Sequence, residues 1–220
     1  ATDHFDRFIA ENGLQYLQSE ELDDADILSE FSGARLPDRV VEDLRVFLRN
    51  VRRPLAVRSS SKLEDSHFQP FAGIYSTYMV PRVDNEDQMI RMLGKAIKGV
   101  YASVYYRASR AYIEASANSL ADEKMAVVIQ EICGTEDDGY YFPTLSGVAR
   151  SLNFYPIGDE RPEDGIANIA LGLGKLVVEG GITLRFSPAY PQHVLQLSTP
   201  ELTLRDTQRV MYALSLDPSR

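Results

Sequence analysis

The segment Pro54–Tyr78 holds the residues whose types and spacing best suit chemistry on a phosphate. A short apolar run leads into Arg58, which is followed by three consecutive serines, Ser59–Ser61. An arginine side chain forks onto phosphate oxygens, and hydroxyl groups donate further hydrogen bonds to them. A surface loop with an ordinary Arg–Glu ion pair would contain the same residue types. The residue chemistry alone therefore leaves a polyphosphate site and a polar surface loop as alternatives.

Two further groups of the same segment bear on this choice. Glu64 and Asp65 supply carboxylates that could hold a metal ion or orient the arginine. Phe71–Gly73 form a small-residue turn whose glycine lets the backbone approach a ligand, and Thr77 adds a hydroxyl. The pattern predicts a strand that delivers one guanidinium to a rim of polar groups, followed by a ligand-contacting loop.

A second glycine-rich segment, Gly172–Lys175, invites comparison with a P-loop, but that comparison fails. The P-loop pattern needs a glycine where the chain has Ile169 and a serine or threonine where it has Leu176. The segment still supplies backbone N–H donors near a predicted strand end, which is a weak indication of phosphate binding.

Zinc and nucleophilic-serine chemistry find no support in the sequence. The histidines are scattered without a ligand spacing, and no G-x-S-x-G pattern surrounds any serine. The three histidines are His4, His67 and His193.

Composition limits the class of protein. At 220 residues and 44% hydrophobic, the chain can form one large domain or two small lobes. A net charge of -9 makes nucleic acids and anionic membranes poor partners. The single cysteine, Cys133, excludes an internal disulfide and fits a reducing cytoplasm. No apolar run could span a bilayer and the start is not signal-like, so we expect a cytoplasmic protein.

Helical periodicity dominates the first half of the chain and short apolar strands dominate the second, which predicts an α+β fold. The acidic stretch Glu20–Asp26 is expected to be a solvated face or a helix cap. We expect Met125–Ile132 and Thr144–Phe154 to pair as a hairpin. The predicted helices are His4–Leu17, Pro37–Val51, Asp87–Ala117 and Leu202–Leu214, and the other predicted strands are Leu55–Val57, Gly165–Leu171, Ile182–Phe186 and Val194–Leu197.

The order of the motifs says more than any one of them. From Pro54 to Pro188 the chain resembles the N-terminal nucleotide-binding domain of phosphoenolpyruvate synthase and pyruvate phosphate dikinase. The matching segments, in order, are VRSS (Val57–Ser60), Glu64-Asp65, FAG (Phe71–Gly73) with Thr77, MAVVIQEI (Met125–Ile132), SGVA (Ser146–Ala149), and GLG (Gly172–Gly174) followed by Val177-Val178 and Gly180.

The resemblance implies an ATP-grasp-like nucleotide-binding fold, with two lobes around a cleft that holds ATP and Mg²⁺. In this chain residues 1–53 would be a helical lead-in, residues 54–124 a lobe with the VRSS and FAG loops, and residues 125–220 a strand-rich lobe. The resemblance assigns Arg58 the catalytic role of meeting the phosphates, with nucleotide contacts from Ser59, Ala72, Gly73, Ile74, Thr77, Gln130, Glu131, Lys175 and Arg185. Gln130 would lie beside the adenine.

The second half of the motif set departs from the family. Lys175 stands where the family usually has a glutamate, and Asn168 falls near a position that often carries a metal-binding carboxylate. Asn168 and Glu179 are the expected metal-site residues, and Arg185 lies close to the next polar position of the family.

The resemblance implies a phosphotransferase function, in which ATP phosphorylates a histidine on another domain, from which the phosphate passes to pyruvate. We expect the chain to be part of a longer protein whose phosphohistidine and pyruvate/phosphoenolpyruvate domains are its partners. The alternatives are a degenerate domain that senses nucleotide or binds a partner without catalysis, and, more remotely, an ATP-grasp ligase.

Overall fold

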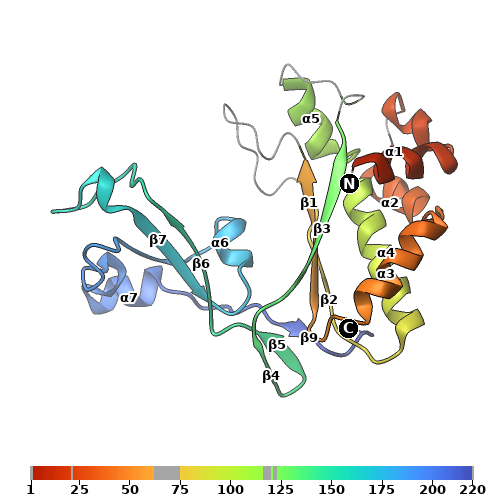
Figure 1. Cartoon of the computed structure of the whole chain (residues 1–220). Helices are drawn as coiled ribbons and strands as arrows, with labels where there is room; N and C mark the ends of the chain where they lie inside the picture. Colours follow the sequence, from red (N-terminus) through yellow and green to blue (C-terminus); the bar gives the residue numbers. More distant parts are fainter. Residues whose placement is uncertain (1, 21, 62–74, 116–119, 121–122, 220) are drawn as a thin grey trace. The chain divides into compact units, whose positions relative to one another are not determined.

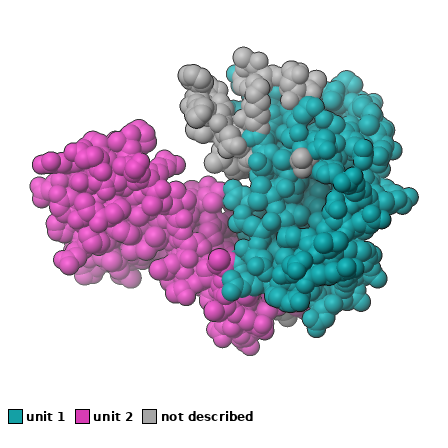
Figure 2. Space-filling model, in the orientation of Figure 1, with its two compact units in different colours: residues 1–132 teal, residues 133–220 magenta. Residues whose placement is uncertain are grey.

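The computed structural model describes residues 2–20, 22–61, 75–115, 120 and 123–219. The chain divides into two compact units, Ala1–Ile132 and Cys133–Arg220 (Figures 1 and 2). Helix and sheet occur together, which confirms the α+β prediction.

The first unit is a three-stranded antiparallel sheet with its helices packed on one face (Figure 1). Helix α4 packs against all three strands, and α2 and α3 pack against α4. The elements are α1 (Thr2–Glu11), η1 (Leu14–Gln18), α2 (Asp24–Gly33), α3 (Asp38–Leu48), β1 (Leu55–Ser61), β2 (Tyr78–Val80), α4 (Glu86–Ser103), α5 (Arg107–Ala115) and β3 (Met125–Glu131).

An aromatic cluster joins the helices of this unit. Phe8 is fully buried, and its ring lies 5.7 Å from the ring of Phe31 and 5.4 Å from that of Tyr101. Tyr105 adds a further contact with Phe31 at 5.6 Å. Such rings bury large apolar areas, so this cluster fixes α1 and α2 against α4.

The predictions for the first unit differ from the structure at several elements. The first predicted helix ends at Glu11, and the side-chain amide of the next residue, Asn12, donates to the carbonyl oxygens of Phe8 and Arg35. Helix α2 was not predicted, but a helix cap was one of the two alternatives for Glu20–Asp26: the Asp23 carboxylate accepts from the backbone N–H of Asp26 at 2.8 Å. A cap of this kind satisfies an N–H group that the helix itself cannot pair.

The predicted helix over residues 87–117 is wrong as a single element, because the chain breaks between α4 and α5. Ser109 Oγ donates to the carbonyl oxygen of Ser103 at 2.6 Å, and the backbone N–H of Arg107 donates to Asp24 at 2.9 Å. The first turn of α5 is therefore capped by a residue of α2, far away in the sequence.

The predicted hairpin between Met125–Ile132 and Thr144–Phe154 is also wrong. Strand β3 pairs antiparallel with β1 along its whole length, from Leu55 opposite Glu131 to Ser61 opposite Met125. Strand β1 is thus the centre of the sheet, in the order β2-β1-β3.

The second unit contains two three-stranded antiparallel sheets, β4-β5-β9 and β6-β7-β8 (Figure 1). The predicted last helix is shorter than expected and ends at Asp206, after which the chain extends alongside Gly172. The elements are β4 (Thr135–Asp137), β5 (Tyr140–Phe142), β6 (Leu145–Arg150), η3 (Pro162–Asp164), β7 (Ile166–Leu171), α6 (Lys175–Val178), β8 (Leu184–Phe186), η4 (Leu195–Leu197), α7 (Pro200–Asp206) and β9 (Leu214–Ser215).

Candidate functional site

Strands β1 and β3 bring two of the predicted site residues onto one face of the sheet. In the antiparallel register Arg58 lies opposite Val128, and Ala56 lies opposite Gln130. Residues directly opposite each other project to the same face, and alternate residues of one strand share a face. Arg58, Val128 and Gln130 are all exposed there, on the face opposite to the one that α4 covers.

The alternation separates the serines of the VRSS segment. Ser59 is buried, with 6% of its surface exposed, and it shares the helix-covered face with the fully buried Val57. Ser60 is partly exposed and projects to the side of Arg58. Sequence reasoning named Ser59 and missed Ser60; the period-two pattern of a strand was the signal that could have found it.

Glu131, at the end of β3, is hydrogen-bonded to the segment that precedes β1. Its Oε1 accepts hydrogen bonds from the backbone N–H groups of Arg52 and Arg53, at 3.0 and 3.1 Å. These two bonds lower the pKa of the Glu131 carboxyl below its ordinary value. One carboxylate oxygen is therefore used to hold the chain just before Pro54.

Thr77 is exposed immediately before β2, the neighbouring edge strand. The predicted glycine loop, with Ala72, Gly73 and Ile74, lies outside the described residues, as do the carboxylates of Glu64 and Asp65.

In the second unit, the predicted residues fall into two local groups. Lys175 and Glu179 bracket the four-residue helix α6 and form an exposed ion pair at 3.4 Å. The Lys175 Nζ also lies 5.4 Å from the centre of the Tyr212 ring, within cation–π range. The Lys175 side chain is therefore held between Glu179 and the ring of Tyr212.

The glycine-rich segment before α6 is fixed by that same C-terminal segment. The side chain of Gln208 bonds to both the N–H and the carbonyl of Leu171, at 2.7 and 2.9 Å, and the Leu173 N–H donates to Tyr212 O at 2.8 Å. Gly172 has φ +78°, and a Cβ there would lie 2.5 Å from Tyr212 O. Of the backbone N–H groups that sequence reasoning offered to phosphate, that of Leu173 is therefore already bonded, as is that of Lys175, which donates to the carbonyl oxygen of Leu173 at 2.9 Å.

Asn168 and Arg185 face each other across β7 and β8. The Arg185 guanidinium is engaged elsewhere: Nη2 lies 2.9 Å from Glu160 Oε2 and 2.8 Å from the carbonyl oxygen of Tyr155. Glu160 Oε2 also accepts from the amide of Asn153 at 2.9 Å, and only 1% of Asn153 is exposed. Hydrogen bonds from Arg185 lower the pKa of the Glu160 carboxyl.

The donor set available to a metal ion is small. The described part of the chain contains no group of three or more His, Cys, Asp or Glu side chains able to hold a metal. Glu179 supplies one carboxylate and Asn168 one amide oxygen. Oxygen donors of this kind suit Mg²⁺, which is typically held by one or two carboxylates, waters and the phosphates of its nucleotide.

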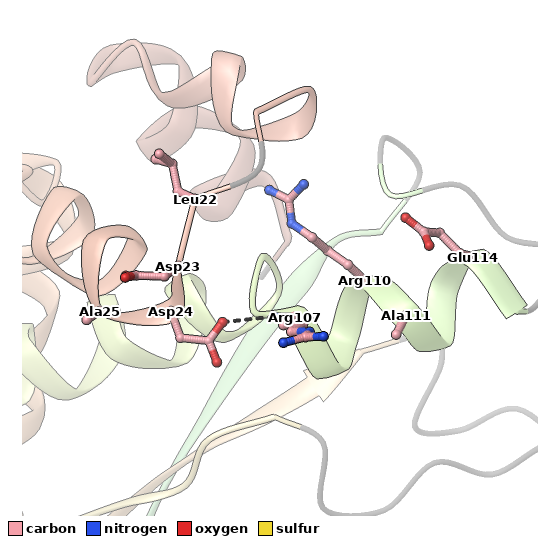
Figure 3. A pocket seen from close by; sticks show the side chains of 8 residues that line it. All are labelled: Leu22, Asp23, Asp24, Ala25, Arg107, Arg110, Ala111 and Glu114. Carbon is pink, nitrogen blue, oxygen red and sulfur yellow. Dashed lines mark hydrogen bonds between the residues drawn. The ribbon is translucent and has the colours of Figure 1, made fainter.

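A cavity of about 760 Å³ lies between the start of α2 and α5 in the first unit (Figure 3). Carboxylates and guanidinium groups both line it, so it selects no ligand charge. None of the predicted site residues is among its lining residues, which are Leu22, Asp23, Asp24, Ala25, Arg107, Arg110, Ala111 and Glu114.

Comparison with known proteins gives two findings. Residues 1–208 match the family described as "Pyruvate phosphate dikinase, AMP/ATP-binding domain", in agreement with the resemblance seen in the motif order. The chain is also 30% identical over 177 residues to the "Uncharacterized phosphotransferase YvkC" of Bacillus subtilis (strain 168). That similarity covers 80% of this chain but only 19% of the relative, so the chain spans about a fifth of the relative's length.

No membrane-spanning helix occurs in the part of the chain that the structure describes, because none is long and apolar enough.

Proposed function

Because the chain belongs to the pyruvate phosphate dikinase AMP/ATP-binding domain family, we propose that it binds ATP on the exposed face of β1 and β3 and serves phosphoryl transfer. The observation that carries this proposal is the antiparallel register that sets Arg58 and Gln130 on one open face. A phosphate group needs a cation, and a base needs a side chain that donates and accepts hydrogen bonds. This face offers Arg58 for the first and, two residues along β3 from the residue opposite Arg58, Gln130 for the second.

Arg58 would meet the phosphates. Its guanidinium is exposed, it has no ion-pair partner among the described residues, and it can bond bidentately to phosphate oxygens. Ser60, on the same face, would add a hydroxyl donor. Transfer of a phosphoryl group depends mainly on positioning and on neutralising charge, which is what these groups supply.

The base would lie toward the end of β3. Val128 is 39% exposed and offers an apolar surface beside Arg58, and Gln130, two residues further along, can both donate and accept hydrogen bonds. We propose that Gln130 reads the edge of the adenine. Glu131, Thr77 and the Ala72–Ile74 loop complete the proposed contacts of the first unit.

Lys175 and Arg185 are the proposed nucleotide contacts of the second unit, within the ATP-grasp-like two-lobe organisation that the resemblance implies. Glu179 and Asn168 would hold Mg²⁺ that arrives with the nucleotide, and the ion would neutralise phosphate charge there. Ser59, buried on the other face, would act by supporting the strand that carries Arg58.

The reaction of the whole protein is part of the same proposal. The phosphate would pass from ATP to a histidine on a separate domain of the parent chain, and from there to pyruvate, in the cytoplasm. The relative's printed name, a phosphotransferase, supports the class of reaction.

A degenerate domain that senses nucleotide without catalysis is the second candidate. Two observations favour it: Arg185 is already bonded to Glu160 and Tyr155, and Lys175 is paired with Glu179. Both cations are therefore engaged without a ligand, and Asn168 adds no negative charge for a metal.

Calorimetry with ATP, ADP, AMP and GTP, with and without Mg²⁺, tests the proposal. We expect ATP to bind more tightly than GTP, and an absence of adenine-nucleotide binding in the full-length protein would overturn the assignment. Conversion of ATP to AMP with phosphorylation of a histidine in the full-length protein would exclude the degenerate alternative. Binding without turnover would favour it.

A further inference from the structure

A groove on the helical side of the first unit carries three uncompensated positive charges. It lies between the end of α2 and the outer surface of α4, which pack against each other (Figure 1), and its volume is about 360 Å³. Ser32, Leu36, Arg91, Gly94, Lys95 and Lys98 line it. Helix α4 packs on the face of the sheet opposite Arg58, so this groove is independent of the proposed nucleotide site.

The three cations lie on a single stripe of α4, at spacings of four and three residues. No carboxylate of the described residues forms an ion pair with Arg91, Lys95 or Lys98. The two acidic residues of α4, Glu86 and Asp87, are both paired with Arg45, at 2.7 and 2.8 Å. Like charges at these spacings destabilise a helix, so a chain with a net charge of -9 keeps this stripe at a cost.

Hydrogen bonds to α2 fix the position of Lys98. Lys98 Nζ donates to the carbonyl oxygens of Ser32 and Ala34, at 2.5 and 3.2 Å, at the end of α2. Burial lowers the pKa of this lysine, so a nearby anion would stabilise its charged form. Arg91 and Lys95 are exposed and extend the positive surface along the helix.

The floor of the groove is apolar. Gly94 lies between Arg91 and Lys95, and Leu36 packs over it so closely that a Cβ at Gly94 would be 3.3 Å from Leu36 Cδ1. A partner bound in this groove would therefore contact positively charged side chains and the small apolar surface of Leu36 and Gly94 together.

We propose that this groove docks an extended acidic segment of a protein partner, with an aliphatic side chain between carboxylates. The stripe from Arg91 to Lys98 rises about 10 Å along the helix axis. Alternate residues of an extended chain share a face and lie about 6.6 Å apart, so carboxylates two residues before and two residues after the aliphatic side chain point with it into the groove, toward the two ends of the stripe. The aliphatic side chain lies on Leu36 and Gly94, and the Ser32 hydroxyl adds a hydrogen bond.

The test uses the whole chain and the capped peptide Asp-Glu-Leu-Glu-Asp, labelled for fluorescence anisotropy. We expect the peptide to bind, the neutral peptide Asn-Gln-Leu-Gln-Asn not to bind, and affinity to fall as NaCl rises from about 50 to 500 mM. The double variant Arg91→Glu/Lys95→Glu should weaken binding by about tenfold or more, because two attractive pairs become repulsive. Arg49→Glu, an exposed charge reversal at the end of α3, should change it less than about twofold.

Thermal unfolding is measured first, to check that both variants remain folded before their binding is compared. Equal binding by the double variant, or by the neutral peptide, would overturn the proposal, as would no binding to the wild-type chain. Displacement of the acidic peptide by millimolar inorganic phosphate would instead identify a small-anion site. Self-association of the chain that disappears in the double variant would identify a second copy as the occupant.

Discussion

The partly buried ion pair between Glu160 and Arg185 leads to a specific prediction about the second unit. The Glu160 side chain is only 5% exposed and that of Arg185 22% exposed. The carboxylate also accepts from Asn153 and from the backbone N–H of Ile157, at 2.9 and 3.0 Å. These bonds fix the segment after β6 against β8.

We expect Glu160→Gln to destabilise this unit by about 2 kcal/mol. A hydrogen bond to a charged group contributes about 1.5–3 kcal/mol, and here the neutral amide keeps the shape but loses the charge. Arg185 retains the carbonyl oxygen of Tyr155, at 2.8 Å, which places the cost toward the low end. Glu201→Gln, at an exposed position of the same unit, should change stability by less than about 0.5 kcal/mol.

The pH dependence has a definite sign. The pKa of Glu160 is lowered in the folded protein, so its stabilisation is present above the pKa of an unfolded glutamate, about 4.3. It is lost as the pH falls through the lower pKa of the folded state. The difference between wild type and Glu160→Gln should therefore be constant from about pH 8 to pH 5 and shrink as the pH falls below about 4.3.

Amide hydrogen exchange in β7 reports on this unit alone, since the two units need not unfold together. The amide of Ile157 should lose protection first in the variant, because its acceptor is the substituted carboxylate. Equal protection in Glu160→Gln and Glu201→Gln at pH 7, or a difference that grows as the pH falls below about 4.3, would refute this account of the ion pair.

Three further predictions test individual positions. Gly172→Ala should destabilise the second unit by about 2–4 kcal/mol in urea unfolding, because φ is +78° and the new Cβ would collide with Tyr212 O; an unchanged midpoint would contradict this. Ser60→Ala should weaken ATP binding about two- to fivefold at unchanged stability, whereas Ser59→Ala should mainly lower stability, and the reverse pattern would show that the faces are misassigned. Gln130→Ala should reduce the preference for ATP over GTP in competition calorimetry by about tenfold, and an unchanged ratio would remove Gln130 from the base site.

Local pattern was enough to predict much of the first unit. The apolar stripe after Pro37 became α3, with Leu44 and Leu48 buried, and the run before Arg58 became β1. The motif order predicted the family, which the comparison confirmed. Each of these features is encoded within a few neighbouring residues.

Features that depend on distant partners were predicted poorly. Strand β3 was expected to pair with its neighbour in sequence, but β1, about 70 residues earlier, provides its partner. The break before α5 depends on Asp24, and the fixed glycine segment depends on Gln208 and Tyr212. Pairing of this kind is a property of the folded chain and leaves no local signal.

For the candidate site residues, the sequence indicated which residues lie near the proposed site, but it did not indicate to which face each side chain projects or which partners it bonds. Arg58 and Gln130 do share an exposed face, whereas Ser59 projects to the buried one. Arg185 was predicted as a ligand contact, and its bonds to Glu160 could not be read from the sequence because Glu160 lies in a loop without a motif. Its role at the nucleotide stays a prediction.

Calorimetric titration of ATP into Arg58→Ala tests the central claim most directly. Loss of the guanidinium removes a charge-assisted contact worth about 1.5–3 kcal/mol, which corresponds to about a tenfold to hundredfold weaker Kd. Arg58→Lys should fall between wild type and Arg58→Ala, since it keeps the charge but not the fork, and Arg49→Ala should bind like wild type. Because Arg58 is exposed, all three variants should unfold like the wild type. ATP binding by a folded Arg58→Ala variant with the affinity of the wild type would contradict the account.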